Sequence, residues 1–256
     1  MRALNFNGRL QGIGNRLEEI IRLEALSDRW DRPINYFWRN PPPRRRWRRL
    51  LRPTPEALNR TYPILLRAGR VAILPGENAQ AVEWDPIPEL QGSFSGDELR
   101  RCAQRLQAVF PIGFAAGLEP VAIHLRGTDR IDPSSTHEHF LRSEAEFHAL
   151  LERTAAAVNR LGPCPVFLCG DSAAAIARLR SLLEPGITLV DPVCPPAVPT
   201  PYRDFFALTA CRAIYLASQF SSFSLTAALI GDRPIHMANA SSTVRERYGA
   251  RIEPLP

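Results

Sequence analysis

The segment that decides the fold is Val121-Ala122-Ile123-His124-Leu125, which leads directly into the polar run Arg126-Gly127-Thr128-Asp129. An apolar run of this length, followed at once by a glycine-containing loop, is typical of a buried parallel strand and the turn after its carboxyl end. The segments after it continue the pattern: we expect helices over 141–161, 172–183, 203–211 and 222–230, and strands over 166–169, 187–190 and 213–217. Strands that alternate with helices predict a parallel sheet with helices on both faces.

The N-terminal half begins in the same way. A short strand over 3–6 precedes a glycine loop, and a helix follows whose apolar residues recur at helical spacing. A second strand is expected over 33–38. Residues 39–95 are irregular apart from the apolar run 71–74, and a helix is expected over 96–109. We therefore predict an α/β protein with parallel sheets, in which the composition changes after the first strands and becomes regular again from residue 118.

Composition favours a folded protein with an anionic ligand. The chain has 256 residues, 45% of them hydrophobic, and a formal net charge of +6 in which every basic residue is arginine. Arginine holds phosphate through a planar fork and stays charged at all relevant pH values. The five cysteines have no metal-binding spacing, which indicates thiols in a reducing compartment. The sequence begins without a signal-like apolar segment and has no run long enough to span a bilayer, so we expect a cytoplasmic location.

Four polar loops fall where a parallel sheet binds its ligands. In open α/β sheets, ligands bind beyond the carboxyl ends of the strands. Each of these loops follows an expected strand, and three of them lead into a helix. Because such ends lie on one side of a sheet, the four loops predict one cleft. They cover residues 12–15, 124–129, 170–172 and 218–224.

Arg126 is the principal candidate for binding phosphate. It follows a strand and precedes two small residues, which leave room for a diphosphate. A two-pronged arginine there would neutralise a departing diphosphate. The alternative is a surface ion pair with Asp129 or Asp132, which would contribute little. His124 shares the strand face of Arg126 and is either a catalytic group or a buried histidine that bonds its neighbours.

The other loops have a functional and a structural interpretation each. The glycines at 8, 12 and 14 would let backbone amides approach an anion at a helix N-terminus, or would only form a tight turn. The hydroxyls and amides of Ser221-Ser222-Phe223-Ser224 suit phosphate oxygens, although Ser221 or Ser222 must also cap the next helix. Asp171 would accept hydrogen bonds from a base or a ribose, or would cap the helix over 172–183.

Taken in order, these motifs resemble the fucosyltransferase superfamily, with His124-x-Arg126 as the most specific part. The resemblance covers about 1–38 and 118–238. It implies a GT-B-like fold of two Rossmann-like lobes with parallel sheets, a reduced N-terminal lobe over 1–117 and a C-terminal lobe over 118–256 that binds the nucleotide sugar. It implies inverting, metal-independent transfer of fucose from GDP-fucose to a hydroxyl of a glycan, a lipid-linked glycan or a protein, with no further cofactor. It also implies the site residues. Arg126, His124 and Asp129 are the catalytic candidates, and Arg126 would contact the β-phosphate; the remaining donor contacts would come from Gly12, Gly14, Asn15, Asp171, Ser172, Ser221, Ser222, Phe223 and Ser224.

Two features of the sequence depart from that family or lie outside its motifs. Gly127-Thr128 stands where the family often has Arg-Gly or Ile-Gly, and the N-terminal lobe is short. The short lobe motivates an alternative, a non-catalytic module that binds a GDP-sugar or a glycan. The run from Arg44 to Arg52 carries six arginines and is a solvated loop, a peripheral membrane contact at the inner face, or a nucleic-acid contact. RNA binding ranks last because it leaves the four loops unexplained.

Overall fold

The computed structural model describes residues 3–9, 12–39, 65–83, 94–126, 141, 143–196, 198–238 and 241–256. By backbone contacts the chain divides into two units. The first consists of Met1–Pro111 with Pro195–Tyr202, and the second of Ile112–Cys194 with Arg203–Pro256. The hydroxyl of Tyr202 donates to the carbonyl of Leu65, which ties the short returning segment to the first unit. The arginine run and the segment from Gly127 to Asp129 lie outside the described residues.

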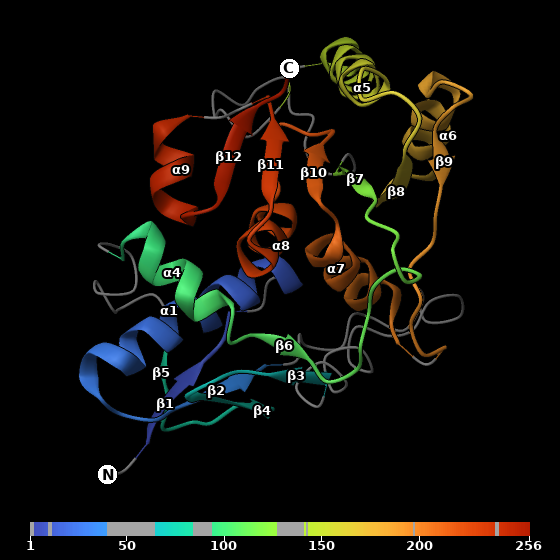
Figure 1. Cartoon of the computed structure of the whole chain (residues 1–256). Coiled ribbons are helices and arrows are strands. Elements are labelled where there is room, and N and C mark those ends of the chain that lie inside the picture. The colour runs from blue at the N-terminus through green and yellow to red at the C-terminus, as the bar shows by residue number, and fades with distance from the viewer. Residues whose placement is uncertain are drawn as a thin grey trace, which may run out of the picture. The chain divides into compact units, whose positions relative to one another are not determined.

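The first unit is built on a parallel sheet of order β4-β2-β1-β5, so in chain order its strands run third, second, first, fourth. Helix α1 follows β1 and packs against β2, β4 and α4. The predicted strand, glycine loop and helix are all present (Figure 1). The bounds of the sheet and helices are β1 Leu4–Asn7, α1 Ile13–Trp30, β2 Ile34–Trp38, β4 Val71–Pro75, β5 Val82–Glu83 and α4 Gly96–Ala103.

The predicted helix over 96–109 is too long. Helix α4 ends at Ala103, and the next residues enter a short strand, β6 (Gln107–Ala108), which pairs with β3 (Leu66–Arg67) in antiparallel register. The amide of Val109 also donates to the carbonyl of Leu65 at 2.8 Å. These backbone pairs replace the helical bonds that the apolar pattern alone had suggested. The helix start was predicted correctly, because Ser95 and Glu98 form a capping box there.

The second unit contains a parallel sheet of order β12-β11-β10-β7-β8-β9. Numbered along this unit, the strand order is 3-2-1-4-5-6, which is that of the Rossmann fold. The order reverses between β7 and β10. The elements are β7 Val121–Leu125, α5 Glu144–Asn159, β8 Pro165–Gly170, α6 Ala173–Leu182, β9 Thr188–Leu189, α7 Thr200–Ala210, β10 Ala213–Leu216, α8 Ser222–Gly231, β11 Pro234–Met237, α9 Ser242–Tyr248 and β12 Arg251–Pro254.

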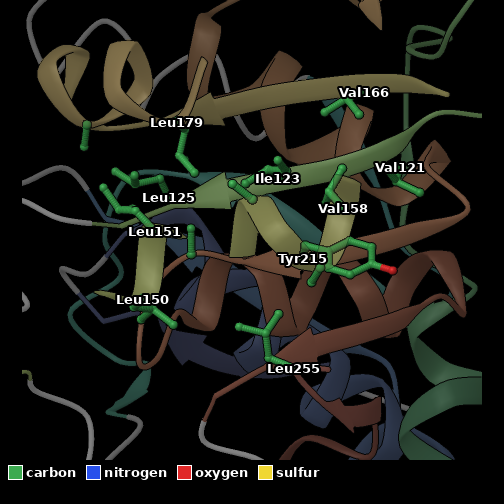
Figure 2. Close-up of a cluster of buried hydrophobic side chains, with 14 of the residues drawn as sticks. Val121, Ile123, Leu125, Leu150, Leu151, Val158, Val166, Leu179, Tyr215 and Leu255 are labelled. Atoms are coloured by element: carbon green, nitrogen blue, oxygen red, sulfur yellow. The ribbon is translucent and has the colours of Figure 1, made fainter. Parts of the chain in front are cut away.

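The core of the second unit lies between the sheet and the helices α5 and α6. Alternate residues of β7 enter it, as Figure 2 shows for Val121, Ile123 and Leu125, which pack with side chains of α5 such as Leu151. The residues between them, Ala122 and His124, are also buried but belong to the opposite face of the strand. A strand that is buried on both faces is apolar at most positions, which is why β7 was predicted to its last residue.

Helix α8 does not end where a glycine was expected to end it. Gly231 is its last residue, and the left-handed cap is Asp232, with φ 49°. Gly231 is required for a different reason: a Cβ atom there would lie 2.4 Å from the backbone oxygen of Thr209. Helix α7, predicted over 203–211, begins at Thr200. The predicted α/β fold with parallel sheets is confirmed. Among the described residues no helix is long and apolar enough to cross a membrane.

Candidate functional site

The candidate site lies at the carboxyl ends of β7, β8 and β10, where the strand order of the second unit reverses. Chains that leave neighbouring parallel strands in opposite directions open a crevice at this point. Here β7 leads toward α5 and β10 leads toward α8. Leu216, the last residue of β10, is in register with His124 of β7. The predicted loops 124–126, 170–172 and 218–224 therefore meet at one edge of the sheet.

Arg126 is the first residue beyond β7, and its side chain is 39% exposed. Its Nε atom lies 3.4 Å from Oδ2 of Asp171, which follows β8. Asp129 and Asp132, the ion-pair partners that the sequence suggested, lie outside the described residues. The pair with Asp171 joins the loops of two neighbouring strands, so a guanidinium and a carboxylate face the same crevice.

Asp171 does not cap helix α6, which corrects one of its two interpretations. The cap is Ser172, whose hydroxyl oxygen accepts the amide of Ala175 at 3.4 Å. The amide of Asp171 donates to the carbonyl of Leu125 at 3.4 Å, which holds the loop against the end of β7. Gly170 must be glycine here, because a Cβ atom would lie 2.6 Å from the Leu125 oxygen. The carboxylate of Asp171 is thereby left for contacts beyond its own helix.

The serine loop performs two separate tasks. Ser221 caps α8 and accepts the amide of Ser224 at 3.4 Å, as one of the two serines was expected to do. The hydroxyl of Ser224 is fully buried and lies 2.6 Å from Nδ1 of His124. Ser222 and Phe223 are the first residues of α8, where backbone amides have no partner within the helix ladder and the helix dipole is positive. This end of α8 favours an anion.

His124 is a buried, neutral imidazole. Burial lowers its pKa to about 4, the charge of Asp171 opposes that shift and the charge of Arg126 adds to it. Its ring stacks on Phe223 with centroids 5.1 Å apart and an angle of 19° between the planes. The structure thus favours the second interpretation of His124, a histidine that bonds its neighbours, while its catalytic role stays a prediction. Asp129, the other candidate base, lies outside the described residues.

Sequence reasoning missed one residue of this site, Ser218. It follows β10 and is fully buried. Its hydroxyl oxygen lies 2.6 Å from the amide nitrogen of Arg126 and 2.7 Å from the carbonyl oxygen of the same residue. The sequence placed Ser218 at the start of the predicted loop 218–224 and gave it no role of its own. The missing information was the strand order, which sets β10 beside β7.

The glycine loop of the first unit leads from β1 into α1, as predicted. Gly12 is the N-cap of α1 in an extended conformation, and no side chain caps the helix there. The first turn contains no acidic residue, so no charge within it offsets the positive end of the helix dipole. Gly14 is buried within the first turn, and Asn15 beside it is half-buried. Donor contacts by Gly12, Gly14 and Asn15, and the cleft shared with the second unit, remain predictions.

A buried carboxyl group lies close to that loop. Glu19 of α1 accepts hydrogen bonds from the Tyr36 hydroxyl at 2.7 Å and from the amide of Arg9 at 3.2 Å. Burial raises the pKa of Glu19 to about 7, although these hydrogen bonds and the nearby arginines oppose the shift. Tyr36 in turn packs so closely on Gly8 that a Cβ atom there would lie 2.1 Å from the tyrosine oxygen.

No family model matches the sequence. A search of curated proteins likewise gives no match. Solved structures do match. The fucosyltransferase NodZ from Bradyrhizobium has a TM-score of 0.50 and 14% identity, with 94% of this chain and 97% of that chain covered. The structure of NodZ alpha-1,6-fucosyltransferase soaked with GDP-fucose gives 0.48 and 13%, covering 90% and 93%. The E. coli heptosyltransferase WaaC with ADP-2-deoxy-2-fluoro heptose gives 0.41 and 11%, covering 91% and 87%.

At such identities the similarity to NodZ shows the fold alone. That fold is the GT-B arrangement of glycosyltransferases, in which parallel α/β units follow each other along the chain. A fold of this kind supports more than one function, so the function has to be argued from the residues of the site.

Proposed function

We propose that this chain is a glycosyltransferase that moves a sugar, fucose by the resemblance of its motifs, from a GDP-sugar to an acceptor hydroxyl. One observation carries the proposal. Arg126 follows β7 at the point where the strand order reverses, and α8, whose first amides have no partner in the helix ladder, follows the neighbouring strand β10. A guanidinium and a helix N-terminus at one crevice make a binding site for a diphosphate.

In the proposed reaction, the bond between the anomeric carbon and the β-phosphate oxygen breaks, and its electron pair stays on that oxygen. The acceptor oxygen bonds to the anomeric carbon from the opposite face, so the configuration inverts. The proton of the acceptor goes to a base, for which Asp129 and His124 are the candidates. Negative charge grows on the β-phosphate as the bond breaks. Fixed donors aimed at that charge stabilise the transition state more than the ground state.

Arg126 is the group that would meet this charge. Its present partner is the carboxylate of Asp171, and both side chains are partly exposed. An exposed pair of this kind is weak, so a diphosphate can replace the carboxylate at low cost. Asp171 would then be released to accept hydrogen bonds from the guanine or the ribose. Ser222 and Phe223 would offer the first amides of α8 to the phosphates.

The decisive experiment compares Arg126→Ala with Arg178→Ala. Arg178 lies in the same unit, is 51% exposed and pairs with Glu152 at 3.1 Å, so it is a matched arginine away from the site. We expect Arg126→Ala to lower the rate of transfer from GDP-fucose by about 100-fold or more, with the protein still folded. Arg178→Ala should retain the wild-type rate. Equal rates for all three proteins would remove Arg126 from the phosphate site.

The donor is identified by a thermal-shift screen against GDP, UDP and ADP and their sugars. A ligand at 100 times its Kd raises the free energy of unfolding by about 2.7 kcal/mol if it binds only the folded state. We expect GDP compounds to give the largest shift. A larger shift with ADP or UDP would contradict the choice of GDP. Tight GDP binding without turnover on any glycan, lipid-linked glycan or protein acceptor would instead support the non-catalytic module.

Three further parts of the proposal have direct tests. We propose that no metal takes part, so transfer should persist in excess EDTA; loss of transfer that Mg²⁺ or Mn²⁺ restores would contradict this. Inversion is read from the anomeric configuration of the product by NMR, which should be opposite to that of the donor. Contact of the Arg44–Arg52 run with an anionic membrane face is also a proposal. It predicts co-sedimentation with phosphatidylserine vesicles at low salt that is lost when 44–52 are deleted.

A further inference from the structure

Ser218 is bonded to both backbone groups of Arg126. The amide of Arg126 donates to the Ser218 hydroxyl oxygen at 2.6 Å, and the hydroxyl can donate to the Arg126 carbonyl at 2.7 Å. The carbonyl of Ala217 lies 2.8 Å from the same oxygen, so the single hydroxyl proton is shared between two acceptors. A buried hydroxyl with one donor and two acceptors around it is fully satisfied.

The hydrogen bonds of Ser218 continue the pairing of β7 with β10 beyond the last backbone hydrogen bond between the two strands. The last backbone bond between the two strands runs from the amide of Ala217 to the carbonyl of His124, at 2.9 Å. Beyond this bond the chains diverge, because β7 continues toward α5 and β10 toward α8. Without the Ser218 hydroxyl, the amide and the carbonyl of Arg126 would each lose this hydrogen bond at the edge of the sheet. The side chain of Ser218 takes over the pairing for one more residue.

The loop 218–224 also holds His124, which lies two positions before Arg126. Ser224 bonds the ring of His124, and Phe223 stacks on it. The backbone of Arg126 is therefore anchored by the segment that also forms the start of α8. Since the guanidinium extends from that backbone, its distance to the amides of α8 depends on this anchor.

We propose that Ser218 is a positioning residue that sets the direction of the Arg126 side chain relative to the N-terminus of α8. The proposal rests on the proposed function insofar as Arg126 binds the donor. Ser218 itself does not contact the donor; it acts through Arg126 alone. Displacement of a binding group by about 1 Å can lower a rate by about 100-fold, so loss of this anchor should weaken both donor binding and transfer.

The test is a double-mutant cycle with Ser218→Ala, Arg126→Ala and the combined variant. In the wild-type background, Ser218→Ala should raise the Kd for GDP and lower kcat/KM for GDP-fucose by about 10-fold or more. In the Arg126→Ala background the same change should alter either value by less than about 2-fold, because residues that act through one another are not additive. Equal effects in the two backgrounds would mean that Ser218 acts on the site by general destabilisation, and the proposal would be wrong.

Ser27→Ala is the matched control. Ser27 is also fully buried and donates to a backbone carbonyl, that of Arg32 at 2.5 Å, but it lies in the first unit. It should lower stability about as much as Ser218→Ala and leave the Kd for GDP within about 2-fold of wild type. If Ser218→Ala does not fold, Ser218→Cys keeps nearly the same volume while offering only a weak acceptor, and the cycle is run with it.

One measurement separates this inference from the proposed function. Hydrogen exchange of the Arg126 amide, followed by NMR without any ligand, reports directly on the anchor. We expect at least a 10-fold faster exchange in Ser218→Ala and no change in Ser27→Ala. An unchanged rate would refute the anchor whatever the protein binds. Faster exchange in a protein that binds no GDP would retain the anchor and remove only the proposed donor site.

Discussion

The pH dependence of stability can be predicted from Glu19, and the prediction can be made quantitative. Glu19 is buried in the first unit with its Oε2 atom bonded by Tyr36 and Arg9. Its Oε1 atom is buried and accepts no hydrogen bond among the described residues, although the Arg9 Nε atom lies 3.6 Å away. Burial raises its pKa from 4.5 to about 7. Glu19→Gln replaces the protonated acid by a neutral group of the same shape.

The sign follows from which state holds the proton. Between pH 4.5 and about 7 the folded chain keeps the Glu19 proton, whereas the unfolded chain has released it. Stability must therefore fall as pH rises through this window. A shift of one pKa unit corresponds to about 1.4 kcal/mol, so the whole shift corresponds to about 3 kcal/mol. Glu19→Gln has no proton to lose and should lack this decline. Its stability relative to wild type should grow by about 3 kcal/mol from pH 4.5 to 7.5.

The assay is urea unfolding followed by tryptophan fluorescence. All four tryptophans, at positions 30, 38, 47 and 84, belong to the first unit, so the signal reports on the unit that contains Glu19. Tyr36→Phe removes one of the hydrogen bonds that lower the pKa, and it should move the decline to higher pH. Parallel curves for wild type and Glu19→Gln across this range would refute the reasoning, because they would mean that Glu19 ionises alike in both states.

Three further changes have defined outcomes. His124→Gln should flatten the calorimetric loss of stability between pH 6.5 and 4, because burial lowers the His124 pKa to about 4 and only the unfolded chain binds a proton in that window; a loss as steep as in wild type would contradict this. Gly231→Ala should lower the free energy of unfolding by about 1–3 kcal/mol, since its Cβ would meet the Thr209 oxygen. Gly12→Ala, which meets nothing within 4 Å, should change it by about 0.5 kcal/mol at most, and equal urea midpoints would refute the contrast. Ser95→Ala removes a capping box and should lower the same free energy by about 1 kcal/mol, and fluorescence-detected unfolding unchanged from wild type would show that the cap is not used.

The sequence predicted those elements whose residues are buried on a regular period. Strand β7 is buried at every position and apolar at all of them except His124, because both of its faces are covered, and its bounds were predicted without error. The elements after residue 231 were not predicted. Strands β11 and β12 each have four residues, which is too short a length to give a clear period of buried positions. Strands of this size are specified mainly by the sheet that they join.

Local sequence also failed for contacts that other strands provide. Asp129 and Asp132 were considered as partners of Arg126 because they follow it closely; they lie outside the described residues, and the partner that the structure shows is Asp171 from the loop after β8. Capping its own helix was one of two interpretations of Asp171, and Ser172 performs that task instead. A pattern along the chain ranks near neighbours first. A parallel sheet instead brings together residues that are separated by a strand and a helix.

Ser218 shows why the site could not be predicted from the loops alone, without knowledge of the strand order. The bond between Ser218 and Arg126 joins residues 92 positions apart. It forms only because the fourth strand of the unit lies beside the first; if β10 had joined the far edge, beside β9, its last residues would have met another loop. The order that opens the crevice is also the order that supplies Arg126 with a buried hydroxyl. At this crevice the segments that follow β7 and β10 separate. The side chain of Ser218 links them again, and in our proposal this link determines the position of the Arg126 guanidinium.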